Sequence, residues 1–145
     1  LNIPHQETRS MEEFYFCFGY HHGADRAWEM DYFRRFGEGR NAEVLGFSQL
    51  KSDLMMRVLN LPELATQIWQ GFPQEKRKWL ELYTQGVNKG FEIGREAQEF
   101  KDKNYAPEPW RPEYSILVLL LQSFDQTRKT FQRDYEEEQI KEKWG

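Results

Sequence analysis

One segment, residues 11–36, constrains this chain most, because its apolar side chains do not fit a single helix face. At helical spacing, one face carries Phe14, Phe18, His21, Asp25, Trp28 and Tyr32, and another carries Phe16, Tyr20, Ala24 and Ala27. A helix that is apolar on more than one face is normally buried between layers. We therefore expect one long helix from about Met11 to Phe36, ended by Gly37 and covered on both sides.

Two glycines inside this segment point the same way. Gly19 and Gly23 lie four residues apart in the predicted helix. Glycine in a helix interior costs about 1 kcal/mol relative to alanine, so close approach by a neighbouring element is the expected compensation. The start of the helix is also marked, because Ser10 and Glu13 fit a capping box in which each side chain accepts from backbone near the other.

The rest of the chain is also predicted to be helical, with prolines separating the segments. A helix over residues 49–59 carries a stripe of Leu50, Leu54 and Val58. Pro62 and Pro73 suit the first turns of two further helices. Residues 104–112 contain three prolines and are expected to form an ordered loop. The most apolar helix then starts at Pro112, and its seam consists of Ile116, Leu120, Phe124, Thr127 and Phe131.

Composition excludes two classes of partner and leaves one question open. The net charge of −4 gives no basic excess for binding nucleic acid. The longest apolar run, Ile116 to Leu121, is far shorter than the roughly 20 residues of a membrane span. Aromatic residues make up 16% of a chain that is 30% charged. These aromatic side chains either fill the chain's own core or form surfaces that a partner covers.

No self-sufficient active site is visible in the residues. Cys17 is the only cysteine and lies among aromatic residues, so we expect an inert thiol packed in the core. Leu1 has no hydroxyl or thiol and is no N-terminal nucleophile. His21 or His22 could pair with Asp25 as metal ligands, but without a third ligand pattern structural hydrogen bonding is the favoured interpretation. The residues alone predict a helical element that packs on something else.

Several fragments resemble a signature of penicillin acylases and related N-acyl amidases. The first is the stretch from Gly19 to Met30 with its continuation, Arg34-Arg35, Gly39-Arg40 and Ala42 to Gly46. The others follow in family order and are Ile3-Pro4-His5, Gly86-Val87-Asn88, and Glu99-Phe100 with Pro107 to Glu113. Together they span nearly the whole chain.

This resemblance implies an N-terminal nucleophile hydrolase, a heterodimer with two β-sheets between helical layers (αββα). Its precursor is cut by autoproteolysis into a smaller α chain and a larger β chain, and the β chain starts with a nucleophilic Ser whose α-amino group acts as base. Residues 1–145 would then be a single α-subunit domain, mostly α-helical with a short N-terminal strand over Leu1 to His5. The resemblance implies no catalytic residue in this chain, a processing site at Gly145, a small N-acyl amide substrate and a periplasmic or secreted location.

The resemblance also marks positions on the last helix. Ser123, Phe124 and Thr127 match its acyl-pocket region, where the penicillin G-specific branch has larger apolar residues, which implies a wider or longer acyl pocket here. Arg133 stands where the family often has a calcium-binding Glu, and a cation does not ligate calcium. No cofactor is therefore expected to be required, and a structural calcium is expected only if Asp134 serves instead.

Four charged residues match family positions without obvious chemistry, namely Asp25, Arg26, Arg40 and Glu43. We expect them to form buried or interfacial ion pairs that position the layers. A different class of function stays open beside the acylase subunit, which is a non-catalytic helical interaction module. The aromatic surplus and the missing local site fit either one.

Overall fold

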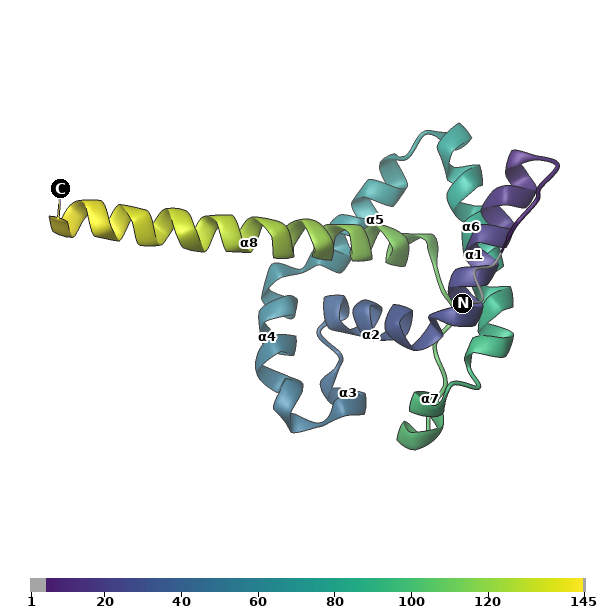
Figure 1. Ribbon diagram of the computed structural model, residues 1–145, viewed down its shortest axis with the longest axis horizontal. Helices are drawn as coiled ribbons and strands as arrows, with labels where there is room; N and C mark the ends of the chain where they lie inside the picture. The colour runs from purple at the N-terminus through teal and green to yellow at the C-terminus, as the bar shows by residue number, and fades with distance from the viewer. Residues whose placement is uncertain (1–4, 145) are drawn as a thin grey trace.

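The structure, a computed structural model, is built from helices (Figure 1). It describes residues 5–144, and the side chains of these apart from residues 128, 129, 131, 132 and 144. The elements are α1 Met11–Asp25, α2 Ala27–Glu38, α3 Ala42–Leu45, the short 3-10 helix η1 Phe47–Gln49, α4 Leu50–Leu59, α5 Leu61–Gly71, α6 Gln74–Gly94, α7 Gln98–Lys103 and α8 Pro112–Trp144. Residues 5–144 contain no strand, which confirms the mostly α-helical prediction. Residues 1–4 of the predicted strand, the Phe131 side chain and Gly145 lie outside the described parts.

The first predicted helix is in fact two, so the expectation of one helix from Met11 to Phe36 is wrong. The backbone breaks at Arg26, with φ −132° and ψ 25°, and the Arg26 N–H donates to the carbonyl of His22 at 2.9 Å. Neither proline nor glycine stands at the break. Because α1 packs on α6 while α2 packs mainly on α4 and α8, tertiary contacts override the local helix preference.

The end of α2 also differs from the prediction. The left-handed residue that caps the helix is Gly39, at φ 64°, and not Gly37. Gly37 is helical and buried instead. A Cβ atom there would lie 2.9 Å from side-chain carbons of Leu117, so this glycine makes room for α8.

Helices α1 and α6 meet along a seam of glycines, which we call the glycine seam. Its members are Gly19 and Gly23 of α1 and Gly86, Gly90 and Gly94 of α6. A Cβ atom on Gly86 would collide with the carbonyl oxygen of Phe16, and one on Gly23 with the carbonyl oxygen of Val87. The close approach predicted from Gly19 and Gly23 is therefore confirmed, with backbone packed directly on backbone. The predicted cap is confirmed as well, since the Glu13 N–H donates to Ser10 Oγ at 3.2 Å; the Glu13 carboxylate reaches back one residue further, to the Arg9 N–H at 2.8 Å.

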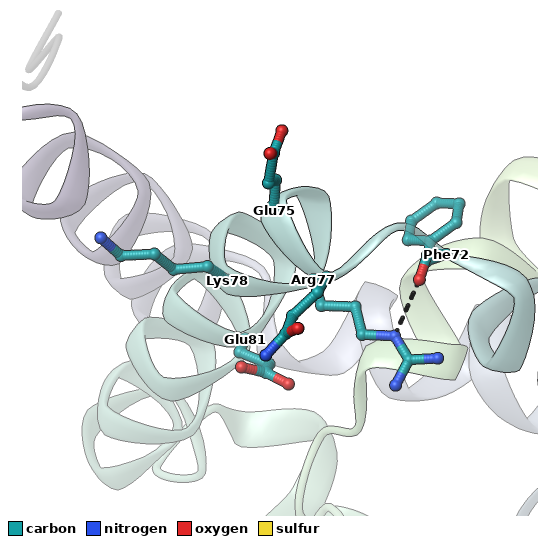
Figure 2. Close-up of a pocket in the computed structure, with 6 residues that line it drawn as sticks. Phe72, Glu75, Arg77, Lys78 and Glu81 are labelled. Atoms are coloured by element: carbon teal, nitrogen blue, oxygen red, sulfur yellow. Dashed lines mark hydrogen bonds between the residues drawn. The ribbon is translucent and has the colours of Figure 1, made fainter.

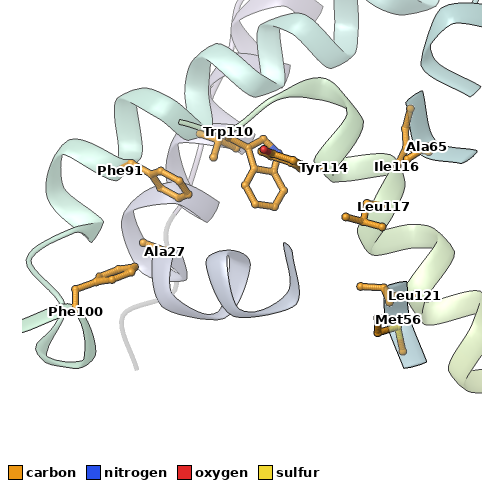
Figure 3. Close-up of a cluster of buried hydrophobic side chains, with 11 residues drawn as sticks. Ala27, Met56, Ala65, Phe91, Phe100, Trp110, Tyr114, Ile116, Leu117 and Leu121 are labelled. Atoms are coloured by element: carbon orange, nitrogen blue, oxygen red, sulfur yellow. The ribbon is translucent and has the colours of Figure 1, made fainter. Parts of the chain in front are cut away.

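The buried side chains form two groups that meet at the start of α8 (Figure 3). One group lies between α2, α6 and α7 and contains Ala27, Phe91, Phe100 and Trp110; the other lies where α8 meets α4 and α5 and contains Met56, Ala65, Ile116, Leu117 and Leu121. The rings of Trp110 and Tyr114 lie edge to face, 5.5 Å apart between centroids, and connect the two groups.

Two apolar or charged surfaces of the chain face outward. The stripe of Leu50, Leu54 and Val58 is present on α4 but exposed, because α4 turns Met56 and Asp53 toward the core instead. Helix α8 packs on α5 through its first turns and then extends away from the other helices (Figure 1). Its described side chains from Arg133 to Lys143 are exposed, which confirms that this charged segment is solvated in the chain.

Candidate functional site

A cluster of charged side chains joins α2, the α2–α3 turn and the loop before α8. We call it the charge cluster, and its members are Asp31, Arg34, Arg35, Glu38, Arg40, Glu43 and Glu108. At its centre, the buried Asp31 carboxylate accepts from Arg34 and, at 2.9 Å, from Arg35. The Tyr105 hydroxyl also donates to Asp31, at 3.0 Å. The buried charges are thus paired and hydrogen-bonded, as buried charges must be.

Glu108 attaches the loop to this cluster. Its carboxylate accepts from Arg40 Nη2 at 2.9 Å and from Arg34 Nη1 at 3.2 Å. Partial burial alone would raise the pKa of Glu108, but the guanidinium groups of Arg40 and Arg34 hold this pKa below its ordinary value. The hydrogen bond from Arg40 likewise lowers the pKa of Glu43. These groups stay charged near neutral pH and serve as structural contacts.

The four predicted ion-pair residues separate into two cases. The structure brings Arg40 and Glu43 together, with Arg40 Nε 2.9 Å from Glu43 Oε1. Asp25 and Arg26 are exposed at the break between α1 and α2, and within the described residues neither forms a salt bridge. Among the described residues Asp25 and Arg26 therefore form no buried pair, and the alternative expectation of an interfacial pair stays a prediction that requires another chain.

His22 has a structural hydrogen bond, as favoured from the sequence. Its Nδ1 lies 2.9 Å from the Tyr83 hydroxyl and so ties α1 to α6, while its ring packs 4.3 Å from that of Phe18. Burial lowers the pKa of His22 and raises the pKa of Tyr83 to about 12. Cys17, two turns before Asp25, is half-buried.

Metal ligands do not gather in the described part of the chain, where no three His, Cys, Asp or Glu side chains are placed to share an ion. Arg133 and Asp134, which the sequence resemblance places at a possible calcium position, are both exposed on the outer part of α8. Their nearest charged atoms lie 3.9 Å apart.

Two of the family-like fragments meet in space at Asn88. The Asn88 side chain donates through Nδ2 to the carbonyl of Trp110 at 2.9 Å and accepts at Oδ1 from the Trp110 N–H at 2.6 Å. The indole Nε1 of Trp110 in turn donates to Ser115 Oγ at 3.0 Å. This arrangement fixes the loop on α6 and sets where α8 starts.

The three predicted acyl-pocket residues lie on two sides of α8. Ser123 and Thr127 are exposed on one face, one turn apart. Ser123 Oγ donates to the Leu119 carbonyl at 3.0 Å, and Thr127 Oγ1 donates to the Ser123 carbonyl. Phe124 is half-buried and packs against the core. Because both hydroxyl protons are already donated to the helix, these side chains offer a ligand van der Waals surface and two hydrogen-bond acceptors but no donor.

An open groove of about 1100 Å³ lies between α1, α2, α6 and α8. Its walls are mostly apolar and include Phe18, Met30, Phe33, Trp79, Tyr83 and Leu119. Leu119 lies one turn before Ser123, so the groove adjoins the predicted acyl-pocket face.

A smaller depression of about 690 Å³ lies at the start of α6 (Figure 2). Its charged side chains point away from one another, and Arg77 Nε donates to the Phe72 carbonyl at 3.0 Å. Arg77 Nη2 also donates to the Gln70 carbonyl at 2.5 Å, so this guanidinium serves to hold the turn between α5 and α6.

Several structural contributors are missing from the sequence prediction. Gly86, Gly90 and Gly94 repeat the four-residue spacing of Gly19 and Gly23, and matching the two spacings would have found the seam. Asp31 and Glu108 have no such signal, because their partners are set by how α2 and the proline-rich loop fold together.

Comparison with known proteins decides the family. The family model described as penicillin amidase matches residues 1–145. The chain belongs to the penicillin amidase family. As a member, it is 32% identical over 131 residues to the acyl-homoserine lactone acylase QuiP of Pseudomonas fluorescens (strain Pf0-1), a match that covers 88% of this chain and 16% of that protein. It is 30% identical over 118 residues to the penicillin acylase 2 proenzyme of Pseudomonas sp. (strain SE83), covering 81% and 15%.

The structural comparison agrees with this family. The thermostable penicillin G acylase from Alcaligenes faecalis in its tetragonal form matches with a TM-score of 0.70 and 25% identity, over 81% of this chain and 65% of that chain. The chain spans only about a sixth of the length of the curated relatives, at 15–16%. Within the described residues, no helix is long and apolar enough to cross a membrane.

Proposed function

We propose that this chain is the smaller subunit of an N-acyl amide hydrolase that splits a side-chain amide into a carboxylic acid and an amine. The observation that carries the proposal is the penicillin amidase match over the whole chain. Relatives named as acyl-homoserine lactone acylase and penicillin acylase support the same reaction class. An N-acyl homoserine lactone or a penicillin is accordingly the kind of substrate we expect.

In this proposal the nucleophilic Ser is the first residue of a larger β chain from the same precursor. Two observations support a short separate chain. The penicillin acylase relative is named a proenzyme, and this chain covers 65% of one matching solved chain but only 16% of a curated relative. The histidine and carboxylates described above are engaged in structural contacts, which fits a scaffold role. The αββα heterodimer, processing at Gly145 and a periplasmic or secreted location are parts of the same proposal.

The chain's own contribution to substrate binding would come from α8. Ser123 and Thr127 form an exposed face with satisfied hydroxyls, suited to apolar contact with an acyl group. Both side chains are small, so the pocket would be wide or long. Phe124 would support this face from the core side, which is a positioning role.

The subunit assignment is tested by expressing the full precursor and sequencing the N-termini of the purified chains. We expect a larger chain that begins with Ser, Thr or Cys, together with hydrolysis of at least one class in a panel of phenylacetyl, short-chain and long-chain amides. A stable monomer that contains this region, remains uncleaved and hydrolyses none of them would support the non-catalytic interaction module instead. Metal analysis of the same preparation tests calcium, and we expect none.

The acyl-wall assignment is tested with Ser123→Phe and Thr127→Phe. Each should lower kcat/KM for long-chain relative to short-chain amides by roughly tenfold or more, because a single methylene in an apolar pocket is worth about 10–200-fold. Ser48→Phe, at an exposed position in η1, is the matched control and should leave the preference unchanged. An unchanged preference in both α8 variants would remove Ser123 and Thr127 from the pocket.

A further inference from the structure

The open groove between α1, α2, α6 and α8 points to a second role for this chain, and this inference rests on the proposed function. We propose that the groove is the seat of an apolar segment of the larger chain, with Phe18, Phe33 and Leu119 as its anchoring contacts. These three side chains come from α1, α2 and α8 and converge on one hollow.

These three side chains are apolar and exposed, which indicates that another polypeptide covers them. Phe18 is 43% exposed, Phe33 47% and Leu119 62%. Soluble monomers seldom leave contiguous apolar patches of this kind in water, and such patches usually mark interaction sites. Aromatic anchors in a concave surface are also the residues that dominate binding energy at protein interfaces.

The size of the groove favours a polypeptide over a small molecule. At about 1100 Å³ it exceeds the roughly 300–1,000 Å³ of ordinary ligand pockets, and it is open to solvent. Its wall is also stiff, because Phe18, Trp79 and Tyr83 belong to the two helices that the glycine seam packs backbone to backbone. A stiff wall provides a preformed seat, which lowers the entropic cost of docking.

The larger chain is the occupant that the observations favour. About five-sixths of the length of the curated relatives lies outside the region matched here, so most of a homologous enzyme is available to cover this surface. The rim of the groove carries the cations Arg26 and Lys76 against the single anion Glu29. An apolar segment flanked by a carboxylate complements this rim, whereas two copies of this chain, each with net charge −4, repel one another.

The groove is favoured over the other exposed apolar surface, on α4. That surface consists of Phe47, Leu50, Leu54 and Val58, and it is supplied by one helix and the short turn before it. The groove, by contrast, combines four helices and includes His22, Arg26 and Met30 of the family-like stretch. It also ends at Leu119, one turn before Ser123, so a segment seated there would hold the acyl wall in place.

The experiment uses the full precursor with an affinity tag on the smaller chain. Phe33→Asp and Leu119→Asp each place a charge in the groove, while Phe47→Asp is the matched control, since Phe47 is 86% exposed outside the groove. We expect each groove variant to reduce the amount of larger chain that co-purifies by at least roughly tenfold, as loss of an interface hot spot does. Phe47→Asp and the conservative Phe33→Leu should both retain it.

The outcomes separate this inference from the proposed function. Groove variants that retain the larger chain as well as the wild type, or equal loss with Phe47→Asp, would overturn the groove assignment even if the enzyme is active. Co-purification that depends on Phe33 and Leu119 in a complex that hydrolyses no amide would uphold the groove and contradict the hydrolase. If light scattering shows that Phe33→Asp abolishes a homodimer of the smaller chain, the occupant is a second copy and our proposal fails.

Discussion

Two regions of this chain hold their helices together by opposite means. In the glycine seam, α1 and α6 touch through backbone atoms, and five glycines leave no space for a methyl group. In the charge cluster, α2 and the loop before α8 are joined by three arginines and four carboxylates, with Asp31 and Arg34 almost wholly out of water. The stability of the glycine seam depends on the close fit of its backbones, and the stability of the charge cluster depends on the pairing of its charges. Added atoms should therefore damage the seam, and lost partners should damage the cluster.

The largest effect is expected at the centre of the cluster. Asp31→Asn keeps the side-chain shape but removes the charge that Arg34 and Arg35 share, and breaking a buried pair costs about 3–5 kcal/mol. Urea unfolding of the purified protein measures this loss. Glu92→Gln removes half of an exposed pair with Lys89 and should change the free energy of unfolding by less than about 0.5 kcal/mol. Equal effects at the two sites would refute the pairing account of the cluster.

The next effect tests the seam by addition of one methyl group. Gly86→Ala raises helix propensity but drives a Cβ atom into the carbonyl of Phe16, so we expect a net loss of about 2–3 kcal/mol by overpacking. Gly71→Ala is the control, since no atom lies within 4 Å of a Cβ built there, and it should be neutral or slightly stabilising. A Gly86→Ala protein as stable as the wild type would show that α1 and α6 can separate without cost.

A third prediction concerns the connection between the two regions. Asn88 lies on the seam helix α6 and holds the backbone of Trp110, in the loop that carries Glu108. Asn88→Ala removes two hydrogen bonds and leaves the Trp110 backbone groups without these partners, which should cost about 2 kcal/mol. Gln85→Ala, on an exposed position of α6, is the control. Loss of stability in the control alone would contradict the role of Asn88.

The smallest expected effects are on the pH dependence of the free energy of unfolding, which differs between the charge cluster and the glycine-seam helices. Glu108 has a lowered pKa, so its contribution is present above its ordinary value of 4.5 and is lost as the pH falls below it. His22 has a pKa below 6.5, so the unfolded chain takes up its proton first and the contact between α1 and α6 weakens below pH 6.5. Both groups are partly exposed, so each term should stay below about 1 kcal/mol after screening.

These two windows are measured as unfolding free energy against pH. Glu108→Gln should flatten the profile below pH 4.5 and leave the region near pH 6 unchanged. His22→Gln should do the reverse, and His5→Gln, at an exposed position, should alter neither. If Glu108→Gln flattens the profile near pH 6, the pH range near 4.5 does not belong to the charge cluster and the range near 6.5 does not belong to the contact between α1 and α6.

How far the sequence predicts the fold depends on the kind of contact. Local signals such as the helix cap at Ser10, the first-turn Pro62 and the start of α8 at Pro112 are reproduced, because they depend on residues close in the chain. The break at Arg26 is not, since it has no proline or glycine and arises from α1 and α2 packing on different helices.

In the candidate site as well, features fixed by local spacing could be predicted from the sequence, and features fixed by neighbouring helices could not. A family resemblance could place Ser123 and Thr127 on one face of a helix, because a spacing of four residues fixes that geometry. The apolar seam correctly predicted that Phe124 packs on the core. The sequence could not reveal that Thr127 of the same seam is exposed or that Asp25 and Arg26 stay unpaired among the described residues, since both depend on which helix lies next to them. Glu108 lies within the family-like fragment Pro107 to Glu113, but its three arginine partners come from a distant part of the chain.

Helix α8 starts just after the loop at Trp110, so a small change of angle at this loop moves the residues far along the helix. Thr127 lies fifteen residues beyond Pro112, which is about 22 Å along a helix that rises 1.5 Å per residue. A tilt of α8 by about 3° at its start would therefore move Thr127 by roughly 1 Å. A displacement of this size in a surface that positions the substrate can lower the reaction rate about a hundredfold. The two hydrogen bonds between Asn88 and Trp110, together with the packing of α8 on α5, therefore limit how far this distant surface can shift.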